Sequence, residues 1–261
     1  MMISEDSVRF AAVGDIHCKT ESVGKLRELF AQAAASADAL LLCGDLTDYG
    51  LPEEADVLVA ELAAASSIPI VAVLGNHDFE SGKQDEVREI LIKAGVRVLD
   101  GEACEIHGVG IAGVKGFAGG FGRGSLGPWG EGAIKLFVNE AIQEALKLEA
   151  SLAKLRTPHR IALLHYSPIA ATVEGEPHEI FPFLGTSRLE DPLLRHPVTA
   201  VFHGHAHRGT PEGKTVNNIP VYNVAKPLLE RTFPDQPAFR IFDVLRSAEP
   251  AASAAEMGVS V

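Results

Sequence analysis

The sequence predicts an α/β layered fold, and two observations support that prediction. First, a unit made of an apolar strand, a polar loop and an amphipathic helix occurs three times in succession at the start of the chain. Strands repeated in this way run parallel, are joined by right-handed helical crossovers and are buried on both faces. Second, the polar motifs follow the expected strands, where the loops of such a sheet form the ligand crevice.

Each of the three units joins a short apolar run to one helix. Apolar residues recur at helical spacing in the helices, whereas the strands are continuous apolar runs. The expected strands cover residues 8–14, 39–43 and 68–74, and the helices that follow them cover residues 25–37, 53–65 and 85–94. Every strand is therefore followed by its own crossover helix.

The pattern changes after residue 94. Short strands at 96–99, 104–108 and 109–114 predict a hairpin region that begins a second sheet. The glycine-rich stretch 116–132 then predicts a mobile loop, and it lacks the strand and helix context of a nucleotide-binding loop. We therefore expect it to form a rim over the site or a plain surface loop.

The longest helix is expected over residues 133–155, where an apolar stripe at helical spacing indicates a face packed on the core. Further strands are expected in the second half of the chain. They cover residues 160–164, 199–202, 219–225 and 238–244, of which the last two look like later strands of the second sheet.

Composition predicts one globular domain. The chain has 261 residues, 46% hydrophobic and 22% charged, which is enough for one large core over residues 1–246. The segment 247–261, rich in alanine and serine, is expected to be a flexible tail.

The chain shows no apolar run long enough for a membrane span and no secretory leader, so we expect a cytoplasmic protein without a membrane partner. Three cysteines without CxxC spacing agree with a reducing compartment. A net charge of −12 without a basic stripe argues against a nucleic-acid surface. The oligomeric state stays open.

Carboxylate, amide and imidazole side chains follow the expected parallel strands one after another. They are Asp15, His17, Asp45, Asp48, Asn76, His77, Asp78, His165, His205 and His207. Each residue alone is explained by turn chemistry or by a buried hydrogen bond. Because the ends of parallel strands lie side by side, the set as a whole predicts one site.

These residue types indicate a metal centre. Carboxylate, amide and imidazole groups bind borderline divalent ions such as manganese, iron and zinc. The set is large enough for two ions if one carboxylate bridges them. Two such ions, with neutral histidines, would leave the site positively charged, which favours an oxyanion such as phosphate.

The ordered motifs GDIH, GDLTD, GNHD, LLHYSP and GHAH carry a family resemblance. The chain resembles the calcineurin-like metallophosphoesterases, whose signature is DxH, GDxxD, GNH[DE], H and GHxH in that order. The resemblance extends from residue 8 to about residue 225. It implies a four-layer α/β/β/α sandwich, with two mixed sheets flanked by helices.

The resemblance also implies roles for the residues. One metal would be held by Asp15, His17 and His207, the other by Asn76, His165 and His205, and Asp45 would bridge them. His77 would give a proton to the leaving group, with Asp78 orienting its imidazole. Asp48 would support the site through hydrogen bonds. His203 matches no motif position and is expected to be a neighbour that supports the site.

The expected function is hydrolysis of a small phosphodiester by a hydroxide activated between two metal ions. Three acids in the segment 167–194, Glu174, Glu176 and Glu179, would repel a polyanion more than a singly charged diester. Phosphomonoester hydrolysis in the same family is the alternative. A metal-binding scaffold without activity is the alternative from another class, although every motif position is intact.

Two neighbouring families fit less well. A metallo-β-lactamase-like hydrolase requires HxHxDH, and Arg208 and Gly209 stand where that motif continues. Protein phosphatases of the broad family carry arginine and glutamate where this chain has Tyr49 and Asp78. A small phosphate ester is therefore the expected substrate.

Overall fold

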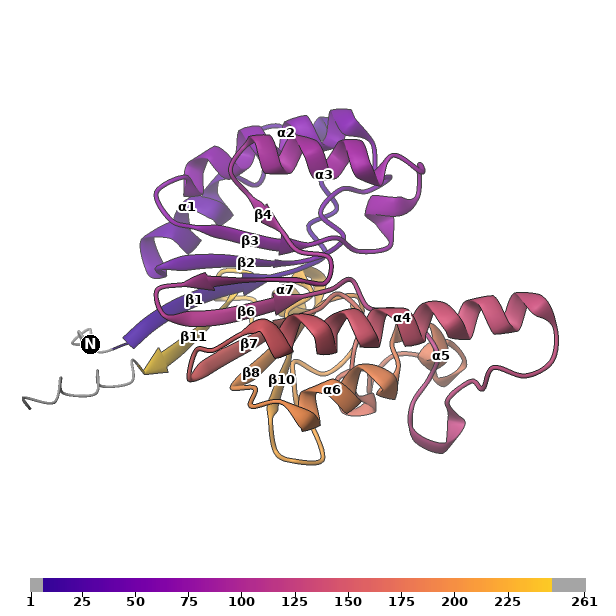
Figure 1. Ribbon diagram of the computed structural model, residues 1–261. Helices are drawn as coiled ribbons and strands as arrows, with labels where there is room; N and C mark the ends of the chain where they lie inside the picture. Colours follow the sequence, from indigo (N-terminus) through magenta and orange to yellow (C-terminus); the bar gives the residue numbers. More distant parts are fainter. Residues whose placement is uncertain (1–6, 246–261) are drawn as a thin grey trace, which may run out of the picture.

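The computed structural model describes residues 7–245, which form two β-sheets packed face to face with helices on their outer faces (Figure 1). Within that range the first sheet has the strand order β11-β1-β2-β3-β4, and the second has the order β5-β6-β7-β8-β10-β9. This is the expected α/β sandwich of two mixed sheets flanked by helices. The predicted tail, 247–261, lies outside the described residues.

The first sheet and its helices come mainly from the start of the chain. Its strands are β1 (Ser7–Val13), β2 (Ala39–Cys43), β3 (Ile70–Val73), β4 (Arg97–Val98) and β11 (Arg240–Leu245). The helices on its outer face are α1 (Arg27–Ser36), α2 (Pro52–Leu62) and α3 (Gln84–Lys93). Strands β1 to β3 run parallel, as the repeated units predict, and β4 pairs in parallel with β3.

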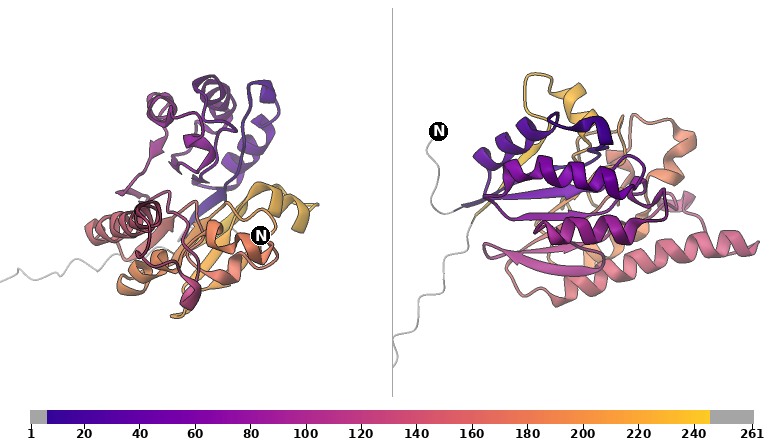
Figure 2. Two further views of the ribbon diagram at one scale, coloured as in Figure 1. Left: turned by 90° about the vertical axis from the view of Figure 1, so that its right-hand side faces the viewer. Right: turned by 90° about the horizontal axis from the view of Figure 1, so that it is seen from above.

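The second sheet comes from the rest of the chain. Its strands are β5 (Glu102–Ile106), β6 (Val109–Gly113), β7 (His159–Leu163), β8 (Ala200–His203), β9 (Glu212–Lys214) and β10 (Pro220–Asn223). The helices of this part are α4 (Gly132–Lys154), α5 (Phe181–Leu184), α6 (Glu190–Arg195) and α7 (Lys226–Thr232). Figure 2 shows the layers end-on, with α1 to α3 on one side of the strands and α4 and α6 on the other.

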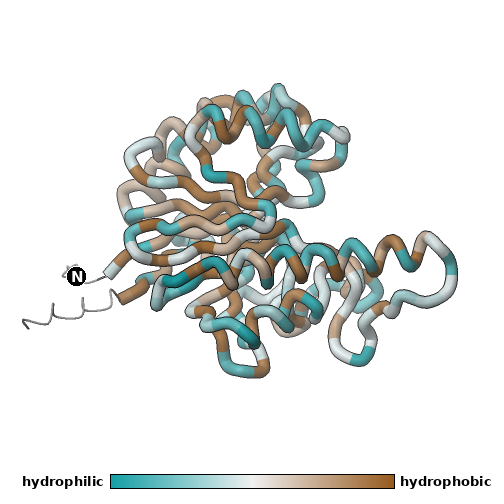
Figure 3. Tube along the Cα trace, viewed as in Figure 1, coloured by the Kyte–Doolittle hydropathy of each residue, from teal (hydrophilic) through white to brown (hydrophobic). Residues whose placement is uncertain are grey.

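Successive side chains of a strand point to opposite faces of the sheet, so each strand of the first sheet packs both on the helices and on the second sheet. In β2, Leu40 and Leu42 pack toward the helices, whereas Leu41 and Cys43 pack toward the second sheet. Both sets are fully buried, which explains why the strand reads as a continuous apolar run. Figure 3 shows these apolar strands gathered in the middle of the molecule and helices with mixed faces around them.

Two strands lie in a different sheet from the one we expected. The run at 96–99 was expected in the second sheet, but β4 pairs in parallel with β3 in the first. The run at 238–244 was also expected in the second sheet, but β11 pairs antiparallel with β1. An apolar pattern predicts that a segment is a strand but does not predict which strand it pairs with. The chain crosses to the second sheet at the turn around Gly101 and returns to the first only with β11.

The glycine-rich stretch and the segment 167–194 are more structured than the sequence indicates. Gly119 donates a backbone hydrogen bond to Pro182 O (2.7 Å), and Gly120 donates one to Gly185 O (2.9 Å). Both stretches lie with α5 beyond the carboxyl ends of the strands, on the same side as the predicted site (Figure 1). Among residues 7–245, no helix is both long and apolar enough to cross a membrane.

Candidate metal centre

The loops after β1, β2, β3, β7 and β8 bring the predicted residues together at one edge of the two sheets. The backbone is strained there. Asp15, His17, Asp45 and His205 have positive φ angles of 55°, 47°, 48° and 70°. Such angles are uncommon for residues other than glycine and concentrate at functional sites.

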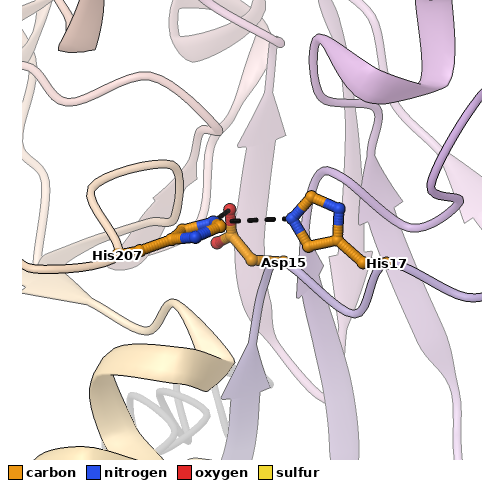
Figure 4. A group of neighbouring side chains, drawn as sticks. All are labelled: Asp15, His17 and His207. Carbon is orange, nitrogen blue, oxygen red and sulfur yellow. Dashed lines mark hydrogen bonds and ion pairs between the residues drawn. The ribbon is translucent and has the colours of Figure 1, made fainter.

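Asp15, His17 and His207 form one group of potential ligand atoms (Figure 4). His207 Nε2 lies 2.9 Å from Asp15 Oδ1 and 3.5 Å from His17 Nε2. Residues from the first and last motifs therefore face one another across the boundary between the sheets. These are the three residues expected to hold one metal.

His165, His205 and Asp45 form a second group, with Asn76 beside it. His165 Nε2 lies 2.9 Å from Asn76 Oδ1 and 3.3 Å from Asp45 Oδ1. The ring of His205 lies 4.8 Å from that of His165, centroid to centroid. The residues expected to hold the other metal are therefore also brought together.

Asp45 stands between the two groups. Its Oδ1 faces His165, whereas its Oδ2 lies 3.8 Å from His17 Nε2. Oδ1 also accepts a hydrogen bond from the backbone N–H of His77 (2.8 Å). One carboxylate oxygen is thus directed toward each group, which is the arrangement a bridging ligand requires.

Three imidazoles in the two groups, those of His165, His205 and His17, are oriented through their other nitrogen. His165 Nδ1 lies 2.9 Å from Cys43 O, and His205 Nε2 lies 3.1 Å from Phe183 O. A carbonyl oxygen only accepts, so these nitrogens carry the hydrogen and the opposite nitrogens keep a free lone pair. His17 Nδ1 is held in the same way by Asp48 Oδ1 at 3.2 Å. The rings are therefore prepared for metal coordination.

Glycines allow the close approach of these loops. A Cβ atom at Gly75 would overlap Asp45, and one at Gly204 would overlap the carboxylate of Asp15. Beside Gly204, the backbone N–H of His205 donates to both carboxylate oxygens of Asp15, at 3.0 and 2.9 Å. The glycines of GNHD and GHAH are therefore steric requirements of the site.

The two buried carboxylates have opposite pKa shifts. Burial and the negative charge of Asp15 raise the pKa of Asp45 to about 7. Burial also acts to raise the pKa of Asp15, but the hydrogen bond from His207 and the nearby histidine charges outweigh it and lower that pKa to about 2. Burial, with the charge of His165, lowers the pKa of His205 to about 3. Crowded acids beside neutral imidazoles fit divalent cations.

The surroundings of His77 differ from our expectation. Its Nδ1 lies 2.7 Å from the backbone oxygen of Asp48, so that carbonyl orients the ring. Asp78, which we expected to do so, is fully buried and accepts hydrogen bonds from Gly75 N (2.8 Å), Leu46 N (3.2 Å) and the Thr47 hydroxyl (2.6 Å). Asp78 therefore joins two loops of the site instead of touching the imidazole.

His203 lies apart from the potential ligand atoms. It is fully buried, with Nδ1 2.8 Å from Gly204 O and Nε2 2.8 Å from the Thr172 hydroxyl. Both ring nitrogens therefore have protein partners. This agrees with the expectation that His203 supports the site as a neighbour.

Sequence reasoning missed several groups that shape the site. The carbonyl oxygens of Cys43 and Phe183 orient histidines, and backbone acceptors leave no signal in a sequence. Tyr166 places its ring 4.4 Å from that of His205, centroid to centroid. Its position directly after His165 is a signal that could have drawn attention to it.

Most of the chain matches a known protein family. Residues 8–209 match the model of the calcineurin-like phosphoesterase family. The chain belongs to this family. Calcineurin-like phosphoesterases are metal-dependent phosphoric ester hydrolases. Among the described residues, a third group of potential ligand atoms overlaps the first two and joins His17, Asp45 and His77. A comparison with curated proteins gave no significant match.

Solved structures share the fold of this phosphoesterase at low sequence identity. Phosphopantetheinyl hydrolase (PptH) from Mycobacterium tuberculosis is 14% identical, with a TM-score of 0.64 over 92% of this chain and 97% of that one. The purple acid phosphatase PPD1 from yellow lupin is 13% identical, with a TM-score of 0.56 over 86% of this chain and 44% of that one. TT1561 of Thermus thermophilus is 15% identical, with a TM-score of 0.52 over 85% and 91%.

Proposed function

We propose that the protein is a phosphodiesterase that hydrolyses a small phosphodiester with the help of two divalent ions. The observation that carries the proposal is the position of Asp45, which directs one oxygen toward each of the two groups of potential ligands. A carboxylate placed in this way can contact two ions at once. Phosphomonoester hydrolysis by the same site is the second candidate.

The donor atoms suggest where each ion would bind. Asp15, His17 and His207 would hold one ion, Asn76, His165 and His205 the other, and Asp45 both. Imidazole, carboxylate and amide donors suit manganese, iron or zinc. When bound, the ions would supply positive charge opposite the phosphoryl oxygens and make water a nucleophile at neutral pH.

His77 is the proposed proton donor. Its side chain is 40% exposed, and its Nε2 lies 4.0 Å from Asp45 Oδ2. The contact of Nδ1 with the Asp48 carbonyl fixes the orientation of the imidazole ring, and therefore the direction of Nε2 at the edge of the metal centre. During hydrolysis an oxygen of water bonds to phosphorus, the ester P–O bond breaks, and the leaving oxygen takes the His77 proton. The proton that the water loses passes to solvent, from which His77 is protonated again.

The charge next to His207 supports a diester substrate. The hydrogen bond with Asp15 raises the pKa of His207, and the negative charge of Glu176 raises it further. Glu176 accepts a hydrogen bond from the backbone N–H of Arg208, the residue after His207, at 2.6 Å, so its carboxylate lies close to this group of potential ligands. A monoester dianion is repelled by this carboxylate more than a diester monoanion.

We also propose a reducing, cytoplasmic location. Cys18 and Cys43 are buried and unpaired, and burial raises the pKa of both thiols. Cys104 is also a free thiol. This thiol content suits a compartment that does not form disulfides.

The function is tested by measuring metal content and activity on the same sample. We expect about two ions per chain, and faster hydrolysis of bis(p-nitrophenyl) phosphate than of p-nitrophenyl phosphate with manganese added. A higher kcat/KM on the monoester would favour the second candidate. Bound metal without activity on either ester, under manganese, iron or zinc, would instead indicate a scaffold.

A further inference from the structure

A buried amide outside the ordered motifs contacts the loop that carries two of the potential ligands. Asn223 ends β10, lies in none of the ordered motifs and is fully buried. Its side-chain nitrogen Nδ2 donates a hydrogen bond to Ala206 O at 2.8 Å. Ala206 stands between His205 and His207, which belong to different groups of potential ligand atoms. The hydrogen bond therefore acts on the short stretch of backbone that joins the two groups.

The amide of Asn223 has partners for both of its polar atoms. Nδ2 also donates to Thr172 O at 3.3 Å, and Oδ1 accepts from the backbone N–H of Ala225 at 3.2 Å. These partners fix the orientation of the amide, because the reverse orientation would turn its oxygen toward two carbonyl oxygens, which cannot donate. A Cβ atom at Gly209 would stand 2.9 Å from Nδ2, so the backbone packs tightly around it. Asn223 is therefore held in place, and it holds Ala206 in turn.

The loop that Asn223 contacts has a strained backbone. His205 has a φ of 70°, and such a conformation persists where the surrounding contacts hold it. In this conformation the backbone N–H of His205 donates to both carboxylate oxygens of Asp15. The neighbouring carbonyl, Ala206 O, accepts from Asn223 and from the backbone N–H of Gly209 at 3.1 Å. These two hydrogen bonds hold the backbone next to the strained residue.

The residues after Asn223 also bind the first sheet. The backbone N–H of Gly14 donates to Val224 O at 2.9 Å, and Gly14 O accepts from the backbone N–H of Lys226 at 2.9 Å. Gly14 directly precedes Asp15, a potential ligand of the first group. Asn223 therefore stands at the point where the ligand-bearing loops of the two sheets meet.

We propose that Asn223 is a positioning residue that directs His205 and His207 toward the two ions by holding the backbone between them. The inference rests on the proposed function, because it requires one ion in each group of potential ligands. Without the amide, Ala206 O loses a buried donor and the strained turn can relax. Both imidazoles would then leave their set directions, so both ions would bind more weakly.

The test measures manganese binding by calorimetric titration of the wild type, Asn223→Ala and Asn223→Leu. Leucine is close to asparagine in shape but cannot donate a hydrogen bond, so it guards against misfolding around the cavity that alanine leaves. We expect the affinity for both ions to fall about 10–100-fold, as on loss of a group that orients metal ligands. In protein loaded with manganese, the electron paramagnetic resonance signal of the coupled ion pair should also change.

Thr215→Val is the matched control. Thr215 is buried, and its hydroxyl accepts a hydrogen bond from the backbone N–H of Ile219 at 3.0 Å. This contact lies in the turn before β10, at the opposite end of that strand from Asn223. The variant therefore loses a buried hydrogen bond in the same hairpin without a change at the metal centre. We expect a lower free energy of unfolding and unchanged affinity for both ions.

Wild-type affinity for both ions in Asn223→Ala and Asn223→Leu would overturn the positioning role and leave the proposed function intact. Weakening of one ion alone would overturn the joint action on His205 and His207. An equal loss of affinity in Thr215→Val would also overturn the role, because metal binding would then follow stability alone. A wild type that binds fewer than two ions would defeat the proposed function, and this inference with it.

Discussion

The two sheets contribute to the metal centre in different ways. Asp15, His17, Asp45 and Asn76 follow strands of the first sheet, one motif for each strand–loop–helix unit. His165, His205 and His207 follow strands of the second sheet. In the first sheet, His17 is oriented by Asp48, a residue of the neighbouring motif, whereas in the second, His205 is oriented by Phe183 from a distant helix.

The difference concerns the kind of group that holds the ligands. On the first side, the side chain of Asp48 positions the imidazole of His17, so a substitution can remove that support. On the second side, backbone oxygens of Cys43 and Phe183 hold the rings, so the support depends on how whole segments pack. Side-chain supports are therefore readable in the sequence, and backbone supports are not.

The largest effect is expected at Asp45, which the two sides share. Asp45→Asn removes the negative charge placed between the two groups of potential ligands. We expect at least a roughly 10³-fold loss of kcat on bis(p-nitrophenyl) phosphate, an order of magnitude based on the loss of transition-state charge stabilisation. Metal analysis should show both ions weakened. Loss of one ion with the other unchanged would mean that Asp45 serves only one side.

A smaller and one-sided effect is expected at Asp48. Asp48→Asn weakens the charged partner of His17 Nδ1, and loss of such an orienting group lowers metal affinity about 10–100-fold. Calorimetric titration with manganese should show one weakened site and one unchanged site. Thr172→Val is the matched change on the second side, since its hydroxyl contacts only His203 and other non-ligand groups, and it should leave both affinities unchanged.

The smallest effect on the metal centre is expected at Glu61, which supports the first side from a distance. Its buried carboxylate accepts backbone hydrogen bonds from Gly24, Leu26 and Arg27 at 2.7–2.9 Å, in the loop between β1 and α1. Burial acts to raise the pKa of Glu61, but these N–H donors outweigh it and lower the pKa. We expect Glu61→Gln to reduce the free energy of unfolding at pH 7 by about 1.5–3 kcal/mol.

The pH dependence of that difference is fixed by the direction of the shift. A lowered pKa stabilises the fold above the ordinary value of 4.5, and this stabilisation is lost as the pH falls through the folded-state pKa. Urea denaturation from pH 7 to pH 3 should show the wild type and Glu61→Gln converge below pH 4.5. A constant difference across that range would contradict the assignment. We propose that residues 1–246 are one domain, so each curve should show a single transition.

The helices and strands were predictable where the residue pattern within one segment determines them. The run ALLLC is β2 at the predicted residues, and the apolar stripe of the predicted helix 133–155 packs α4 on the second sheet through Leu148 and Leu152. The sheet membership of β4 and β11 was not predictable from their patterns. An apolar strand has the same appearance beside either sheet, and its partner is decided by long-range packing.

The residues of the site were predictable because ordered motifs at strand ends are a property of the chain. The mutual geometry was not. Asp78 directs its carboxylate into the loop around Thr47 instead of toward His77, although the two residues are adjacent. Adjacent side chains in a tight turn point in different directions, and the turn is set by contacts with other loops.

By itself, the sequence determined which side chains gather at the carboxyl ends of the parallel strands and that they suit two metal ions, since strand periodicity and residue chemistry are local. Only the tertiary structure decided that Asp45 faces both groups and that distant carbonyls fix His165 and His205. Those relations join residues far apart in the chain, and they exist only once the two sheets are packed.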